Sequence, residues 1–452
     1  MRKIPWCVLL AISSWSPAKG AIQNLSLRQA LDLAAKKNLD LASSILQYEQ
    51  DTINYNNAWR SFYLPNISLN TTSSSGLTLG SYPGTPSGAT LPSGRNTGYP
   101  QSQIGLSLGN YTLFNFFRDR IAFDNARLAF ERSGQVLEET RRRINFQIIS
   151  AYFNARLSQE KLEAAERSLL TSRMIVRLVK SRVDLGEAPA TELSSVEVDA
   201  NDALLQVNTL KAEYQSNILN FTALLNQTAE TSLNLTTPLS FKPVTLSYAD
   251  AINWYKEKSP SMRGAKLSQQ TSQGNLEIQE KNRLPLPTVT FSGVTVSYGN
   301  RYTGGSTSYQ GASTGPGNID VEASVNLTLP ILGPGGLFNK DTVRSARIAV
   351  DQADLAYQRN LISGELQIRG QIFQLTQLED RLKTLKLNFD ASAALLGKIV
   401  SNISSAKGNR LELRDAVERA RNSEIDLLQN EFIHIQQKNG LYDFIGKDWD
   451  GE

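Results

Sequence analysis

Residues that could do chemistry are few and scattered in this chain. It has one cysteine, Cys7, and one histidine, His434, and no second cysteine or histidine that could share a metal ion with them. Cys–His catalysis and Cys/His zinc sites need such residues in clusters. No pair of carboxylates stands in a context that predicts a raised pKa. The sequence therefore predicts no enzyme activity, no catalytic or metal site and no cofactor.

Two other features are predicted to be structural. The run Arg141-Arg142-Arg143 covers consecutive faces of a helix and is expected to be solvated. His434 is expected on the last helix without partners, in a structural or exposed position.

Length and charge limit the class of protein. The chain has 452 residues, which exceeds the usual size of one globular core, so two domains or duplicated halves are expected. Lysine plus arginine (47) nearly balances aspartate plus glutamate (43). A nucleic-acid-binding protein would show a basic excess, so no nucleic-acid partner is expected.

The first twenty residues are typical of an export signal. A basic start (Met1-Arg2-Lys3) precedes an apolar run and a small-residue stretch that ends near Gly20. The alternative is a membrane anchor, but the run is shorter than the ~20 residues that a spanning helix needs. No other apolar stretch is long enough, so any membrane crossing would use β-strands.

Proline placement predicts long helices. Residues 101–188 contain no proline, and no proline occurs after Pro334. Both gaps carry seams with spacings of four and three, which predict coiled-coil packing. The first seam is Ile144, Ile148, Ala151, Ala155, Ser158, Leu162, Ala165, Leu169, Ser172, Val176, Val179 and Val183. The second is Ile368, Ile372, Leu375, Leu382, Phe389, Leu396, Val400 and Ile403, interrupted by Glu379 and Lys386.

The two halves resemble each other at a separation of roughly 220 residues. Residues 26–30 parallel residues 247–251, and Leu64-Pro65 parallels Leu286-Pro287. After the signal peptide at 1–20, we predict a first repeat at 21–240, with helices about 26–62, 118–184 and 190–228 and strands about 64–75 and 102–113. We predict a second repeat at 241–452, with helices about 248–283, 338–405 and 409–440 and strands about 286–298 and 320–331.

The four predicted strands alternate between apolar and polar residues. This pattern suits a sandwich half or a membrane wall equally well. A change of phase at Gly293 predicts a β-bulge. Aromatic residues near the strand ends suit an interfacial girdle, with helix-end packing as the alternative. Four strands cannot close a wall in lipid, so the chain is expected to pool strands with copies of itself.

The order of these motifs resembles the TolC-like outer-membrane efflux proteins over residues 26–446. Residues 25–34 with Asn38 resemble the opening helix of that family, and Leu64-Pro65 resembles its helix-to-strand junction. Residues 329–332, followed by Gly335-Gly336, are similar to its strand-to-helix turn. Residues 186–193 resemble its periplasmic helical turn.

The resemblance implies a mostly helical fold with membrane β structure. In a homotrimer, four strands per chain would complete a 12-stranded β-barrel in outer-membrane lipid. The barrel would continue into a coiled-coil tunnel across the periplasm of a two-membrane bacterium. The implied function is a passive exit duct for efflux or type I secretion. An inner-membrane efflux pump or ABC exporter and a periplasmic adaptor protein would deliver the substrate.

The resemblance also suggests site residues near two helical turns. Glu412 and Asp415 match the family's carboxylates at the tunnel aperture, and the alternative is an exposed acidic pair beside two arginines. Arg410 matches an arginine that links to the other coil, where Thr191 and Glu192 stand; the alternative is a solvated arginine. Gly186 and Gly408 are expected to be left-handed helix caps. The candidate adaptor contacts are Leu185, Gly186, Ala188, Leu193, Gly408 and Leu411.

A second function stays open from sequence. The chain could be a non-channel periplasmic coiled-coil scaffold or adaptor, which would have one continuous hairpin flanked by soluble β domains. Here the strand pairs interrupt both halves, which favours the duct.

Overall fold

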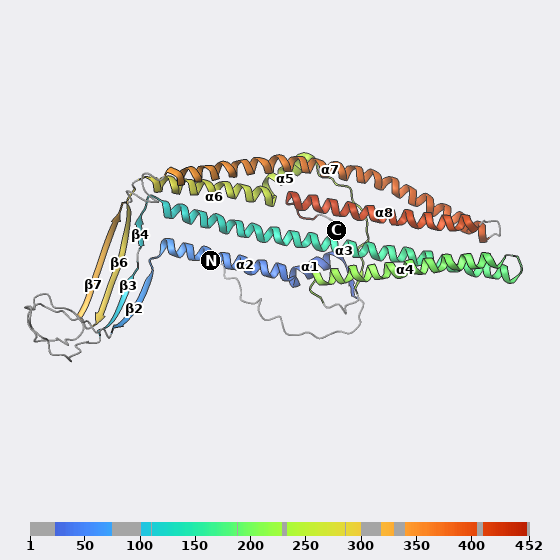
Figure 1. The fold of residues 1–452 in the computed structure, drawn as a ribbon, viewed down its shortest axis with the longest axis horizontal. Helices are drawn as coiled ribbons and strands as arrows, with labels where there is room; N and C mark the ends of the chain where they lie inside the picture. The colour runs from blue at the N-terminus through green and yellow to red at the C-terminus, as the bar shows by residue number, and fades with distance from the viewer. Residues whose placement is uncertain are drawn as a thin grey trace, which may run out of the picture. The chain divides into compact units, whose positions relative to one another are not determined.

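The computed structural model describes residues 23–74, 101–109, 111–187, 189–227, 233–284, 286–299, 318–329, 340–404 and 410–449. The predicted export signal at residues 1–20 lies outside them. The chain is mostly helical, as predicted (Figure 1). It divides into two compact units. Unit one comprises Met1–Tyr48, Gly134–Ala265 and Tyr357–Glu452, and unit two comprises Glu49–Ser133 and Lys266–Ala356.

The helices follow the same order in both halves of the chain. The first half has α1 (Leu27–Lys37), α2 (Leu39–Tyr63), α3 (Arg118–Asp184) and α4 (Ala190–Leu224). The second half has α5 (Tyr248–Lys258), α6 (Pro260–Arg283), α7 (Lys340–Ser404) and α8 (Arg410–Ile445). Among the helices of the described ranges, none carries an apolar stretch long enough to cross a membrane.

The helices expected over 26–62 and 248–283 are each divided in two. Asn38 ends α1 in an extended conformation, and its side chain accepts a hydrogen bond from the N–H of Leu41, which caps α2. Ser259 does the same between α5 and α6, because its hydroxyl accepts from the N–H of Met262. Pro260 then suits the first position of α6, where no N–H is needed.

Unit two contains one antiparallel sheet. Its strands are β2 (Ile67–Ser74), β3 (Gln101–Leu108), β4 (Tyr111–Phe114), β6 (Thr288–Gly299) and β7 (Asn318–Thr328). β6 is central: it pairs with β7 along one edge and with β3 and β4 along the other, and β2 pairs with β3. The register of β6 against β7 shifts between Phe291 and Val294, which confirms the bulge predicted at Gly293.

Aromatic side chains gather where the helices of unit two meet the sheet. The ring of Phe62 stacks on Phe123 with centroids 5.1 Å apart, and Tyr55 stacks on Phe130 at 5.0 Å. Trp59 and Tyr63 contact each other at 5.1 Å, and both remain exposed. Packing of the helix ends therefore explains the position of part of the predicted aromatic girdle. Trp59 and Tyr63 are exposed and are not explained by this packing alone.

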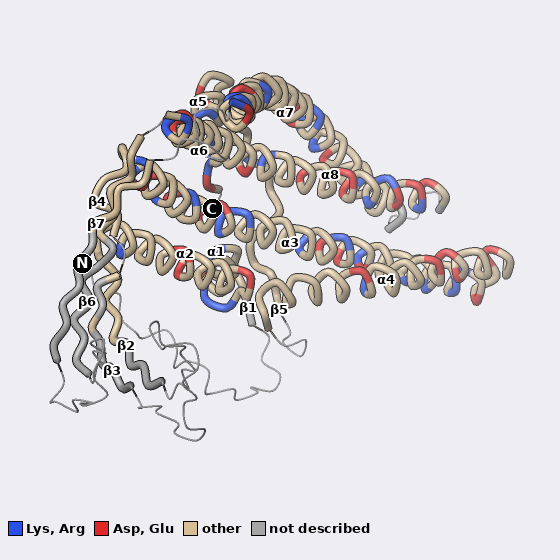
Figure 2. Tube along the Cα trace, turned by 60° about the vertical axis from the view of Figure 1, so that its left-hand side comes forward, with Lys and Arg blue, Asp and Glu red and all other residues tan. Residues whose placement is uncertain are grey.

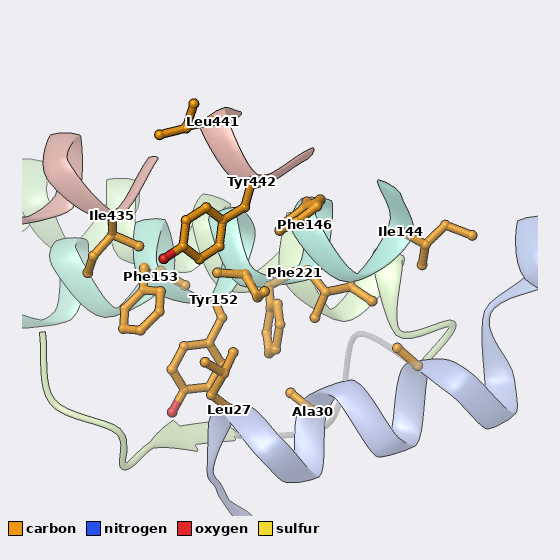
Figure 3. Close-up of a cluster of buried hydrophobic side chains, with 14 of the residues drawn as sticks. Leu27, Ala30, Ile144, Phe146, Tyr152, Phe153, Phe221, Ile435, Leu441 and Tyr442 are labelled. Carbon is orange, nitrogen blue, oxygen red and sulfur yellow. The ribbon is translucent and has the colours of Figure 1, made fainter. Parts of the chain in front are cut away.

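The main core lies in unit one. Side chains from α1, α3, α4 and α8 meet around Tyr152, Phe221 and Tyr442, which are all fully buried (Figure 3). The predicted seam of α3 is buried at Ile144, Ile148, Ala155, Ser158, Ala165, Leu169 and Val179. Ile144, Ile148 and Ala155 belong to this core, whereas Ala165 and Leu169 pack in a second, smaller cluster with Val207 of α4. The seam of α7 is buried at Ile368, Leu375 and Leu382.

A short parallel sheet, absent from the prediction, ties the two ends of the first half together. β1 (Gln23–Leu25) pairs with β5 (Leu233–Leu235). The hydroxyl of Tyr152 donates to the carbonyl of Leu25 at 2.9 Å, and the N–H of Thr237 donates to that hydroxyl at 2.9 Å. Tyr152 thereby joins this sheet to the middle of α3.

Candidate functional site

The turn between α3 and α4 has the backbone of a Schellman motif. Gly186 has φ +74, its N–H donates to the carbonyl of Val183, and the N–H of Glu187 donates to the carbonyl of Arg182. The prediction of a left-handed cap at Gly186 is confirmed. The second predicted cap, Gly408, lies outside the described residues, as does Ala188.

The predicted adaptor contacts at these turns differ in exposure. Leu185 is 71% exposed beside Gly186, and Leu411 is exposed in the first turn of α8. Leu193 is half-buried in the first turn of α4. Exposed leucines at both turns suit a surface for a partner protein.

The predicted aperture residues lie at the start of α8. Glu412 and Asp415 are both exposed, and neither makes an ion pair among the described side chains. Arg410 begins α8, and only its backbone is described. On α4, Thr191 is exposed and Glu192 is half-buried. That Glu412 and Asp415 face a tunnel aperture, and that Arg410 links α8 to α4, both stay predictions.

Two arginines one and three turns further along α8 link it to α4. Arg414 Nη1 lies 3.2 Å from Oδ1 of Asp199, and its Nε lies 3.5 Å from Glu418 on its own helix. Arg421 Nη1 donates to Oε1 of Gln206 at 2.6 Å. These links were not predicted, because the register of α8 against α4 cannot be read from one sequence.

A groove of about 220 Å³ runs between α3, α4 and α8 at these links. Its walls mix charged, polar and apolar side chains: Ser168, Ser172, Ile175, Val196, Asp199, Asp202, Ala203, Gln206, Arg414, Val417, Glu418 and Arg421. Acidic and basic residues are mixed along α3 and α8, whereas α4 carries acidic residues and a single lysine (Figure 2). Polar contacts of this kind each contribute little free energy, while Val196 and Val417 in the same groove are buried.

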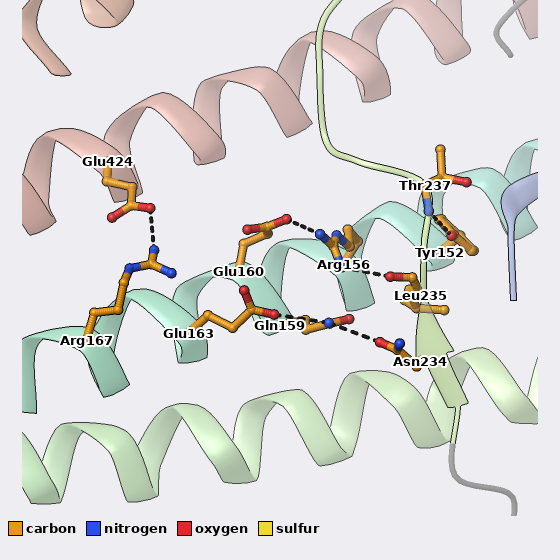
Figure 4. Close-up of polar contacts among 10 residues, drawn as sticks. All are labelled: Tyr152, Arg156, Gln159, Glu160, Glu163, Arg167, Asn234, Leu235, Thr237 and Glu424. Atoms are coloured by element: carbon orange, nitrogen blue, oxygen red, sulfur yellow. Dashed lines mark hydrogen bonds and ion pairs between the residues drawn. The ribbon is translucent and has the colours of Figure 1, made fainter. Parts of the chain in front are cut away.

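Deeper along α8, carboxylates accumulate at the contact with α3. Arg167 donates to Glu424 at 2.6 Å, and Arg156 pairs with Glu160 (Figure 4). Burial raises the pKa of Glu424, while the charge of Arg167 lowers it. Burial raises the pKa of Glu431 to about 7, and the charge of Lys386 partly opposes this.

We expect Glu431→Gln to be more stable than the natural protein above pH 7. The folded protein binds more protons than the unfolded chain between the ordinary pKa of 4.5 and about 7, so stability falls as pH rises through that window. The neutral amide removes this loss, which is about 1 kcal/mol once solvent screening is allowed for. Thermal unfolding at pH 5 and pH 8 measures it.

Glu412→Gln is the matched control, because Glu412 is exposed on the same helix. It should unfold like the natural protein at both pH values. Identical pH profiles for Glu431→Gln and the natural protein would contradict the raised pKa.

His434 is fully buried and has a partner, so the prediction that it lacks one is wrong. Its Nε2 lies 3.2 Å from Oε1 of Glu379, and the same oxygen accepts from the N–H of Val244 at 2.8 Å. Burial lowers the pKa of His434, and the hydrogen bond with Glu379 opposes this. The charge that interrupts the seam of α7 is thus satisfied by α8 and by the segment before α5.

The described residues contain no group of three His, Cys, Asp or Glu side chains that could hold a metal ion. Within the described residues, the site consists of polar links that join α8 to α4.

Comparison with known proteins agrees with this architecture. Residues 30–227 match the family model described as "Outer membrane efflux protein". No curated protein matches the chain. Over these residues the match confirms the resemblance to the TolC-like outer-membrane efflux proteins that the sequence motifs predicted.

Solved structures share the fold at low sequence identity. The CmeC outer membrane channel of Campylobacter jejuni is 17% identical over 94% of this chain and 87% of its own, with a TM-score of 0.72. The open state of the MtrE outer membrane channel of Neisseria gonorrhoeae is 18% identical over 93% and 89%, with a TM-score of 0.72. The outer membrane protein VceC of Vibrio cholerae is 15% identical over 94% and 97%, with a TM-score of 0.71.

Proposed function

We propose that this chain, which carries the outer membrane efflux protein match in its first half and the fold of outer membrane channels throughout, forms a trimeric exit duct. The duct lies in the outer membrane and extends into the periplasm. It conducts passively, and an inner-membrane pump or ABC exporter delivers the substrate through a periplasmic adaptor. The exposed apolar face of the sheet in unit two is the observation that carries the proposal.

That face is built from several strands. Leu69 on β2 is opposite Leu106 on β3, and cross-strand partners share one face of a sheet. Toward the other edge of the sheet, Leu327 on β7 is opposite Val289 on β6 and lies on the same face. Ile67, Leu69, Leu106, Val325 and Leu327 are all exposed. A soluble single chain rarely leaves so many large apolar side chains in water, whereas lipid would cover them.

Both long outer strands of the sheet have a free edge among the described strands, and the four-residue β4 likewise pairs with β6 alone. β2 pairs only with β3, and β7 pairs only with β6. Unpaired N–H and C=O groups are not tolerated in lipid. Pairing β7 of one copy with β2 of the next removes both edges, and three copies then close the wall.

Helical seams support the same assembly. α7 carries exposed apolar residues at spacings of seven and four: Ile348, Leu355, Ile362, Leu366, Phe373 and Leu387. α2 carries Leu39, Leu46 and Ile53, and α4 carries Val198, Leu205 and Leu219, at multiples of seven. Such stripes are coiled-coil seams without a partner in one chain. We assign the α7 seam of one copy to the α2 and α4 seams of its neighbour.

Leu366→Glu on the α7 seam is expected to prevent assembly while leaving each chain folded. A carboxylate placed in an apolar seam must lose its hydration, and this happens three times in the trimer. We expect at least a tenfold loss of trimer, measured by light scattering in detergent, with an unchanged circular dichroism spectrum.

Gln367→Glu is the matched control, because it adds the same charge to an exposed position off the seam. It should remain trimeric. A trimeric Leu366→Glu protein would contradict the assigned interface.

The periplasmic partners are proposed to bind at the helical turns. Leu185 and Leu411 are exposed there, and Gly186 shapes the turn beside Leu185. Links such as Arg414–Asp199 lie directly behind these turns. A docking adaptor can therefore act on the links that hold α8 against α4.

Conductance in a planar bilayer tests the function. The purified full chain should insert from detergent and give discrete channel steps. A protein that purifies without detergent as a monomer and gives no steps would favour the periplasmic scaffold instead.

A further inference from the structure

A second cavity, remote from the links between α4 and α8, lies in unit one. It has a volume of about 550 Å³, within the range of small-molecule sites. Its walls come from the start of α1, the middle of α3, the segment before α5 and the end of the described chain: Ser26, Leu27, Arg28, Leu31, Arg142, Asn145, Phe146, Ile149, Thr237, Asp448 and Trp449. Leu27 and Phe146 also belong to the adjoining core (Figure 3).

Arg142 in this wall is buried, contrary to the prediction that the arginine run is solvated. Only 9% of it is exposed, whereas Arg141 and Arg143 are exposed. Its Nη1 donates to the carbonyl of Gly446 at 2.6 Å. Its Nε and Nη2 are buried and have no hydrogen-bond partner. Guanidinium N–H groups left in this state cost free energy that a bound acceptor would recover.

Other groups around the cavity attract an anion. The indole Nε1 of Trp449 is a second buried donor without a partner. The N-terminus of α1 carries partial positive charge and has no acidic residue in its first turn. Arg28 adds an exposed positive charge. The opposing charges are Asp448, exposed in the wall, and Asp443, which interacts electrostatically with Arg142.

The rest of the wall combines the polar side chains of Ser26, Asn145 and Thr237 with an apolar part. Leu27, Phe146 and Ile149 are buried side chains that would cover a hydrocarbon or aromatic body. Nε and Nη2 lie on one side of a guanidinium, so two oxygens of one anionic group can accept from both.

We propose that this cavity binds a small organic anion, a carboxylate or a phosphate monoester carried on an aromatic or aliphatic body, through Nε and Nη2 of Arg142. The anionic group lies against the guanidinium and the body lies against Phe146 and Ile149. The site does not depend on the duct, because it needs only the fold of unit one.

Binding to the full chain in detergent tests the proposal. Benzoate and phenyl phosphate are the two anionic probes, and benzamide is the neutral probe of the same size. Ligand-observed NMR and thermal shift should show saturable binding of an anion with a Kd on the order of 1 mM. The stronger of the two anions identifies carboxylate or phosphate as the natural group. Benzamide should bind at least tenfold more weakly.

Variants locate the site. Arg142→Gln should weaken anion binding at least tenfold, and Arg141→Gln, the exposed neighbour, should leave it unchanged. Trp449→Phe keeps an aromatic ring and removes the indole donor, so it should weaken binding several-fold even if Arg142→Gln fails to fold. Equal binding of benzamide and benzoate, no effect of either variant, or no saturable binding would overturn the proposal.

Discussion

Gly364→Ala is expected to destabilise the protein by about 2 kcal/mol, although alanine is the better helix former. Gly364 is buried in α7, and a Cβ there would lie closer than 3.0 Å to three atoms of the Tyr255 side chain. Tyr255 cannot retreat easily, because its hydroxyl donates to the carbonyl of Asn360 at 2.8 Å and its ring stacks on Phe444 at 5.0 Å. Thermal unfolding of the detergent-solubilised protein measures the loss.

Gly370→Ala is the matched control on the same helix. A Cβ at Gly370 would have no neighbour within 4 Å, so alanine should stabilise the helix by about 0.5–1 kcal/mol. Adding Tyr255→Leu to Gly364→Ala should restore space, so the double variant should lose less than the sum of the single variants. Equal stabilities of Gly364→Ala and Gly370→Ala would contradict the close approach of α5 to α7.

The features that the sequence predicted well are periodic or local. The seam of α3 follows from apolar residues at spacings of four and three, and burial of that seam needs no knowledge of its partner. The cap at Gly186 follows from glycine's freedom at positive φ, and the bulge follows from a phase change at Gly293. Each of these depends only on residues near one another in the chain.

The missed features depend on contacts between distant segments. Asn38 breaks the first helix, and its side chain also donates to the carbonyl of Leu224, 186 residues away. Glu379 and His434 meet only because α7 and α8 pack in one particular register. Arg142 is different, since a signal was present: three consecutive helical residues span about 200° of the helix, so all three arginines are solvated only where the buried face fits within the remaining ~160°.

The candidate site shows the same division. Its turns and its charged helix ends follow from local sequence, whereas its links depend on packing. The motif singled out Arg410 and Glu192, but the described links to α4 come from Arg414 and Arg421, further along α8. A motif can therefore find the region that holds two coils together while the register of the coils selects the residues.

Removing both links, with Arg414→Ala and Arg421→Ala together, is expected to open the proposed duct. One such link, polar and in contact with solvent, contributes about 0.2–1 kcal/mol, which is small. Two links in three copies together contribute about 1–6 kcal/mol to the closed state, because the trimer opens as a unit. The open fraction should rise at least about fivefold, and the mean conductance in a planar bilayer should rise with it.

Arg419→Ala controls for the loss of positive charge, because Arg419 is exposed on the same helix. The Arg419→Ala variant should conduct like the natural protein. A charge swap, Arg414→Asp with Asp199→Arg, should bring conductance back toward the natural level by restoring the pair that lies 3.2 Å apart. If the double alanine variant conducts like the natural protein, the links between α8 and α4 do not keep the proposed duct closed. Since the links are few and only half-buried, an adaptor that binds near Leu185 and Leu411 needs only a few kcal/mol of binding energy to replace them.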